Sequence, residues 1–125
     1  MTSLPPIDRD TALRLLEKQV EEAGPDYVYQ TPDSSQVCKY VVNGQPSCLI
    51  ARALVDYGVP VSVIAAWDAP TKTIGMAYSA YAADFLTYES AAVFEAAQDK
   101  QDSNESWGSA LAAARIAALE LAEES

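Results

Sequence analysis

Residues 36–59, QVCKYVVNGQPSCLIARALVDYGV, predict a strand, a turn and a helix within one short run. The β-branched and aromatic side chains at 37–42 favour a strand. The Asn-Gly pair at 43–44 tolerates the positive φ of a turn. A helix should then begin at residues 46–47 and end at Gly58, because a residue without Cβ can take the left-handed cap. We expect this run to turn the chain from sheet to helix.

Upstream of this run, the sequence predicts an arm and an amphipathic helix. Residues 1–7 contain two adjacent prolines and are expected to form a flexible N-terminal arm. Asp8 or Asp10 can cap a helix that runs to about Ala23 and is ended by the Gly-Pro pair at 24–25. The apolar side chains of this helix fall on one face, so it must pack against another element.

A β-hairpin is expected on the N-terminal side of the opening run. Residues 27–30 predict a short aromatic strand, and residues 31–35 are rich in the residue types that form turns. If this turn folds the chain back, 27–30 pairs with 37–42. A lone hairpin is marginally stable in water, so helices should cover one of its faces.

The C-terminal half is expected to be mainly helical. Pro60 suits the first turn of a short helix. Neither a helix period nor a strand period dominates over 71–86, where we expect a short extended piece followed by a helix. Thr87 can cap a helix over 88–101, and a last helix is expected over 105–122. The predicted apolar face of that last helix consists of Trp107, Ala110, Leu111, Ala114, Ala118 and Leu121.

These elements together predict one α+β domain over residues 8–125. We expect a two-stranded antiparallel hairpin packed against four to six helices, with the two C-terminal helices forming an antiparallel pair. The length of 125 residues suits a single domain with its own core.

The charge of the chain restricts its partners. It has 18 acidic and eight basic residues and a formal net charge of −10. Such a charge opposes attraction to the phosphates of nucleic acids and to anionic lipids. No apolar run approaches the roughly 18 to 20 residues of a membrane span, and residues 1–10 lack the pattern of a secretory signal. We therefore expect a cytoplasmic protein with no membrane partner and no ordinary affinity for nucleic acid.

The composition also removes most catalytic chemistry. The sequence contains no histidine, which excludes Ser-His-Asp and Cys-His mechanisms and histidine-based metal sites. Two cysteines cannot form a four-thiolate zinc site, and the chain has no phosphate-binding lysine loop or glycine-rich dinucleotide turn. We therefore expect no catalytic, metal-binding or cofactor-binding residues and no cofactor.

The two cysteines are interpreted first as a structural thiol pair. Cys38 falls on the predicted strand and Cys48 in the first turn of the following helix. Two buried reduced thiols suit a reducing cytoplasm, and a disulfide is the second interpretation. A helix N-terminus also favours a thiolate, so a small thiol-dependent enzyme or redox protein centred on Cys48 is the alternative function.

A DNA-binding regulator is a third hypothesis. Residues 49–67 predict two helices joined by a tight turn, as in a helix-turn-helix. The second helix would read VPVSVIAAW, which has no side chain suited to base edges and no cation for phosphate. This chemistry and the net charge disfavour the hypothesis.

The acidic C-terminal region is the predicted interaction surface. Residues 88–125 hold eight acidic and two basic residues. Such charge can be a solvated helical surface, a patch that docks on a basic partner, or a DNA mimic. Ile116 projects away from the predicted apolar face of the last helix, with Leu119 beside it. The candidate surface consists of Glu95, Asp99, Asp102, Ile116, Leu119, Glu120 and Glu123.

Two runs carry a resemblance to known proteins: CKYVVNGQPSCLIARALVDYGV and AAQDKQDSNESWGSAL at 96–111. They cover about a third of the chain. The residues in question are Cys38, Tyr40, Gly44, Pro46, Cys48-Leu49, Gln98, Gln101-Asp102 and Trp107-Gly108. They resemble small proteins of actinobacteria and actinobacteriophages for which no activity is known. The resemblance implies a phage or actinobacterial setting, and it places both cysteines in a structural signature.

The function expected from the sequence is therefore a non-enzymatic protein–protein interaction or regulatory protein. In a phage setting it would modulate a host protein in the host cytoplasm. The expected partner is a host protein or a second copy of the chain, and a homodimer through the last helix is the simplest version.

Overall fold

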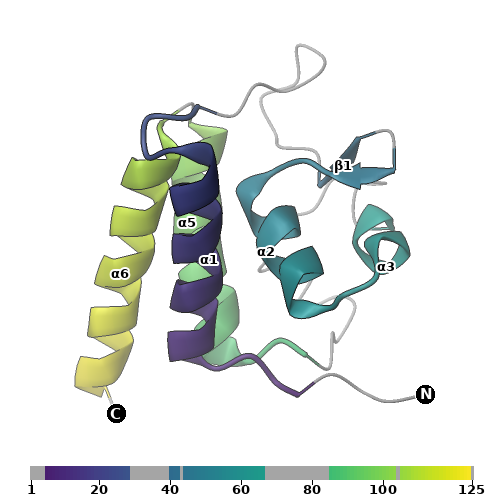
Figure 1. Cartoon of the computed structure of the whole chain (residues 1–125). Helices are drawn as coiled ribbons and strands as arrows, with labels where there is room; N and C mark the ends of the chain where they lie inside the picture. Colours follow the sequence, from purple (N-terminus) through teal and green to yellow (C-terminus); the bar gives the residue numbers. More distant parts are fainter. Residues whose placement is uncertain (1–4, 29–39, 43, 67–84, 104, 125) are drawn as a thin grey trace.

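The computed structural model describes residues 5–28, 40–42, 44–66, 85–103 and 105–124. Its elements, in chain order, are α1 (Arg9–Ala23), β1 (Val41–Val42), β2 (Gln45–Pro46), α2 (Leu49–Tyr57), α3 (Val61–Ala65), α5 (Tyr88–Asp102) and α6 (Trp107–Glu124). α5 and α6 pack together, α1 contacts both, and α2 packs on α1 (Figure 1). The predicted α+β domain, with a two-stranded antiparallel hairpin, several helices and a C-terminal helix pair, is confirmed.

Local signals set most helix ends. The Asp8 carboxylate accepts a hydrogen bond from the Thr11 N–H at 2.7 Å, and α1 ends at Gly24, whose φ is 97°. α2 ends as predicted at Gly58, with φ 121°, but begins at Leu49, later than the predicted 46–47. Thr87 caps α5 as predicted. These features act over one helical turn, which is why the sequence alone reveals them.

The cap at Asp8 predicts a pH-dependent contribution to stability. Hydrogen bonds from the side chain and the N–H of Thr11 hold the pKa of Asp8 below its ordinary value. A carboxyl with a lowered pKa in the folded state stabilises fully above its unfolded pKa, and the contribution disappears as pH falls through the folded pKa. We expect Asp8→Ala to destabilise the protein at neutral pH, with a difference from wild type that shrinks at acidic pH.

Urea unfolding of wild type and Asp8→Ala, at several pH values from neutral to acidic, measures this difference. Comparison of the two proteins at each pH isolates the contribution of the Asp8 side chain. Asp8→Asn is the matched control, because asparagine also caps helices but does not titrate. A difference between wild type and Asp8→Ala that stays constant into the acidic range would contradict the prediction.

The hairpin forms, and β1 lies within the predicted strand over 37–42, but its partner is β2 and not the predicted strand over 27–30. Val41 pairs with Pro46 and Val42 with Gln45, so the chain reverses between Val42 and Gln45. Val28, on the predicted first strand, instead forms an isolated antiparallel bridge with Ser106. A two-residue connection closes at a much smaller entropic cost than a long loop, which favours the local partner. Residues 29–39 and 67–84, which include all of the predicted 31–35 turn and most of the uncertain 71–86 segment, lie outside the described residues.

The packed part of the chain begins before residue 8, so the predicted arm over 1–7 is too long. Ile7 is fully buried, its N–H donates to the Phe85 carbonyl at 2.8 Å, and it forms a parallel bridge with Leu86. The Tyr57 hydroxyl donates to the Pro5 carbonyl at 2.6 Å. A buried apolar side chain and backbone pairing to a distant segment outweigh the loop-like local sequence.

The start of α6 is fixed against the segment that follows α1. The N–H groups of Trp107 and Gly108 donate to the carbonyls of Tyr27 and Pro25, each at 2.8 Å. A Cβ at Gly108 would lie 2.8 Å from the Pro25 carbonyl oxygen, so only glycine permits this approach. The predicted apolar face of α6 is confirmed: five of its members are buried, namely Trp107, Ala110, Leu111, Ala114 and Ala118, and Leu121 packs against the core.

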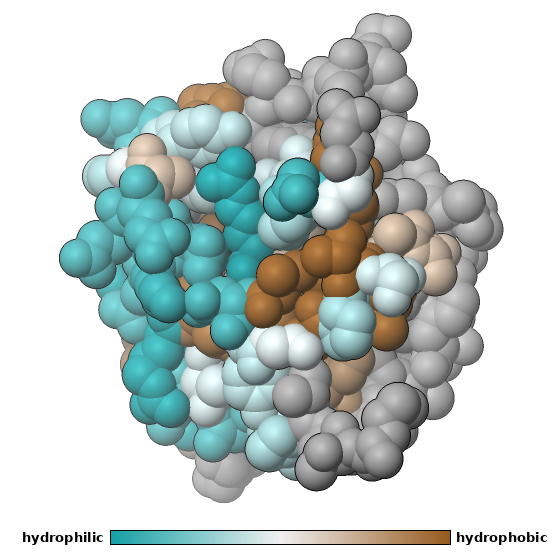
Figure 2. Space-filling model, turned by 45° about the vertical axis from the view of Figure 1, so that its right-hand side comes forward, coloured by the Kyte–Doolittle hydropathy of each residue, from teal (hydrophilic) through white to brown (hydrophobic). Residues whose placement is uncertain are grey.

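The surface is not uniform in character. On the side where Figure 1 shows α2 and α3, apolar side chains gather near the centre of the face, and hydrophilic side chains cover the part beside them (Figure 2). Val63 of α3 is 40% exposed. None of the helices within the described ranges combines the length and apolar character needed to cross a membrane.

Candidate interaction surface

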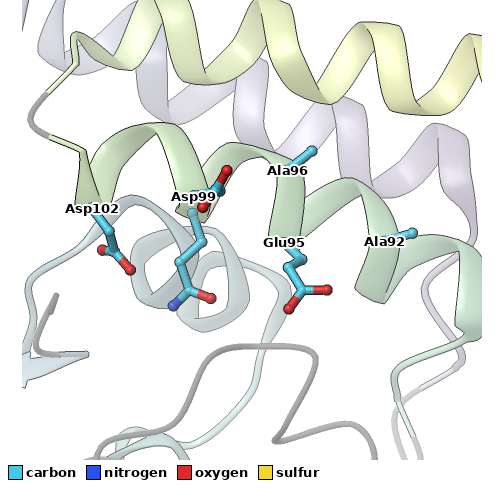
Figure 3. A pocket seen from close by; sticks show the side chains of 6 residues that line it. Ala92, Glu95, Ala96, Asp99 and Asp102 are labelled. Carbon is cyan, nitrogen blue, oxygen red and sulfur yellow. The ribbon is translucent and has the colours of Figure 1, made fainter.

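The predicted acidic residues of α5 gather on one side of the helix. Glu95, Asp99 and Asp102 line a hollow of about 440 Å³, together with Ala92, Ala96 and Gln98 of the same helix. Figure 3 shows the side chains of Glu95 and Asp102 pointing to the same side of the helix. Spacings of three and four residues place them in one row. This row forms the first of two surfaces into which the predicted set divides.

Two carboxylates of this row are not neutralised within the described part of the chain. Glu95 and Asp99 form no ion pair with any of the described residues. Lys100, the one basic residue of α5, pairs with Glu105 at 3.5 Å. The row therefore adds to the negative field of a chain that already carries a net charge of −10.

The second surface is apolar and lies on α6. Ile116 is 57% and Leu119 66% exposed, the values expected of side chains without a packing partner. Leu119 borders a hollow of about 380 Å³ between α1 and α6, here called the α1/α6 groove. Its lining residues are Arg9, Asp10, Leu13, Arg115, Ala118, Leu119 and Ala122. The sequence analysis included Leu119 in the candidate surface but not Leu13. The packing of α1 against α6, which brings the two side chains to one groove, cannot be predicted from the sequence of either helix alone.

The two arginines that line the groove already form ion pairs with carboxylates of the same chain. Arg115 donates to Glu17 at 3.0 Å, and Arg9 lies 3.3 Å from Glu89 and 3.8 Å from Asp10. The predicted residues Glu120 and Glu123 are exposed on α6 and form no ion pair with another residue in the described ranges. Neither glutamate lines the groove: Glu120 follows Ile116 by four residues and Glu123 follows Leu119 by four, so the two carboxylates flank the exposed aliphatic side chains.

Of the two cysteines, only Cys48 lies within the described residues. It is a free thiol with no exposed surface, and it is the residue preceding α2 rather than part of its first turn. A nucleophilic thiol has to reach its substrate, so this burial disfavours the alternative of an enzyme centred on Cys48. Cys38 lies outside the described residues, which leaves the predicted pair itself untested.

The structure gives no support to the hypothesis that residues 49–67 form a DNA-binding helix-turn-helix. α3 is five residues long, and its sequence VSVIA has no basic side chain. The guanidinium of Arg52, on α2, lies 5.1 Å from the centre of the Trp107 ring, an arrangement typical of a cation–π contact. The cation of this tract is therefore engaged within the fold, and the DNA-binding hypothesis stays disfavoured.

A buried polar network joins α2, α5 and α6. The Gln101 Oε1 accepts the N–H of Leu49 at 2.8 Å and the indole N–H of Trp107 at 3.0 Å. The Gln98 amide donates to the Tyr40 hydroxyl at 2.7 Å. Both glutamines are 1% exposed. Gln101 thus caps α2 from a distant helix, a role that Cys48 does not fill with its side chain.

The network contains Tyr40, Leu49, Gln98, Gln101 and Trp107, all of which belong to the two sequence runs that resemble actinobacterial and phage proteins. In this structure these residues have an architectural role. Sequence reasoning did not predict the burial of the glutamines. A signal was present, because Phe94, Ala97, Gln98 and Gln101 follow the spacing of one buried helix face. The Gln101 Nε2 finds no acceptor among the described residues.

The described part of the chain offers no group of three or more carboxylate or thiol side chains placed to hold a metal ion. Comparison of the chain with protein-family models, with curated proteins and with solved structures gives no match. The candidate site is therefore defined by its own geometry: an apolar groove with two exposed aliphatic side chains, beside acidic helix faces.

Proposed function

We propose that the protein is a non-enzymatic interaction protein that binds a partner protein through the α1/α6 groove and the adjacent Ile116. One observation carries the proposal: two large aliphatic side chains, Ile116 and Leu119, are more than half exposed beside an apolar groove. Large exposed aliphatic groups that adjoin a concave apolar surface are typical of protein-binding sites. Charged side chains at the rim of such a site fix orientation and speed association.

The rest of the molecule supports a binding rather than a catalytic role. The chain has no histidine, and Cys48 is enclosed in the core. The buried glutamine network holds the scaffold together, so the groove is presented by packed helices. If the chain is encoded by a phage, as its resemblance implies, the partner would be a host protein in the host cytoplasm.

Site-specific photo-crosslinking in the native cells tests this function. We expect benzophenone side chains at 116 or 119 to capture a discrete partner, because both positions lie at the proposed interface. The matched control is position 63, which is an exposed apolar site on α3, far from α6 in Figure 1. Capture at none of the three positions, or equal capture at all of them, would contradict the proposal.

A further inference from the structure

Building on this proposed function, we infer that the occupant of the α1/α6 groove is a basic amphipathic helix of the partner, and not a second copy of this chain. The shape of the groove and the charges around it support this assignment in separate ways.

The shape favours a helix. The groove runs between two helices that pack side by side, α1 and α6 (Figure 1). Its apolar lining consists of small and aliphatic side chains, which include Leu13 from α1 and Ala118 and Ala122 from α6. Small side chains let a third helix approach closely, and an amphipathic helix lays aliphatic anchors at three- and four-residue spacing into such a groove. Leu119 stands at the edge, where it can pack against the aliphatic face of the incoming helix.

The charges favour a basic partner. The two arginines that line the groove already contact carboxylates of this chain, Arg9 with Asp10 and Glu89 and Arg115 with Glu17. Glu120 and Glu123 have no cation among the described side chains. A helix with lysine or arginine beside its apolar face would supply the missing cations, and the charge of −10 would speed its approach.

The same charges oppose a homodimer. In a two-fold interface both copies present the same surface, so the carboxylates beside Ile116 and Leu119 would be brought together from the two copies. Glu120 and Glu123 of each copy would then enter one interface, where like charges repel. Arg115, the nearest cation on α6, is already paired with Glu17. The homodimer expected from the sequence is therefore the less favourable occupant.

Two synthetic peptides serve as probes for this inference. One is an 18-residue helix with leucine on one face and lysine elsewhere, and the other has glutamate in place of every lysine. Titration calorimetry of the full chain should show binding of the lysine peptide and none of the glutamate peptide. Because leucine anchors carry such contacts, Leu119→Ala should weaken binding about tenfold or more.

Matched variants separate a specific site from general attraction to an acidic protein. Glu120→Gln with Glu123→Gln should weaken binding and reduce its salt dependence, whereas Val63→Ala, on α3, should leave both unchanged. Lysine-peptide binding that is insensitive to Leu119→Ala, or absent, would overturn the inference. So would a dimer in sedimentation velocity that Leu119→Ala dissociates.

The two proposals fail in different ways. If positions 116 and 119 capture a partner whose crosslinked segment is not a basic helix, the interaction function stands and only the nature of the occupant is wrong. If neither position captures a partner, the proposed function itself fails, whatever the peptides do.

Discussion

Trp107→Ala is expected to lower the free energy of unfolding by about 3–5 kcal/mol, the range for truncating a large buried aromatic side chain. Trp107 has no exposed surface, and its ring meets the Tyr27 ring edge-on at 4.5 Å and the Arg52 guanidinium at 5.1 Å. Its indole N–H also donates to Gln101. Removing the side chain leaves a cavity where several segments meet, and this cannot collapse without moving all of them.

Urea unfolding followed by far-ultraviolet circular dichroism measures the loss without relying on tryptophan fluorescence. Leu119→Ala is the matched control, because it truncates an exposed aliphatic side chain of the same helix and should stay within about 0.5 kcal/mol of wild type. If Trp107→Ala does not fold, Trp107→Phe keeps a ring and removes the indole N–H. A loss below about 1 kcal/mol for Trp107→Ala would show that the side chain is not packed as described.

Gln101→Leu is expected to destabilise the protein by about 2–5 kcal/mol, even though it places an apolar residue in an apolar interior. The substitution removes the acceptor of two buried donors, the N–H of Leu49 and the indole N–H of Trp107. Each buried donor left without a partner costs about 1–3 kcal/mol. The first turn of α2 would also lose its distant cap.

A double-mutant cycle identifies the cause. Combined with Trp107→Phe, Gln101→Leu leaves one orphaned donor instead of two, so the double variant should lose about 1 kcal/mol less than the sum of the single losses. The control is Gln45→Leu, which makes the same change at an exposed position of β2 and should be nearly neutral. Additive losses would mean that the hydrogen bond to Trp107 does not contribute, and a neutral Gln101→Leu would contradict the contribution of both hydrogen bonds.

The candidate site was predictable in part. The exposure of Ile116 and Leu119 follows from their positions on the side of α6 opposite its apolar face, and the structure bears this out. The sequence did not reveal that Leu13 of α1 completes an apolar groove beside them. Nor could it show which carboxylates are neutralised, because the partners of Glu17 and Glu89 are arginines 98 and 80 residues away in sequence.

The sequence by itself determined most ends of the described helices. Caps at Asp8 and Thr87, glycines at 24 and 58, and three-to-four residue periodicity all act within a turn or two of the chain. The tertiary structure decided the strand partners, the burial of Ile7 and the two glutamines, and the α1/α6 groove. These features depend on contacts between segments distant in sequence. A polar or loop-like residue is buried there only because a matching partner arrives from elsewhere in the fold.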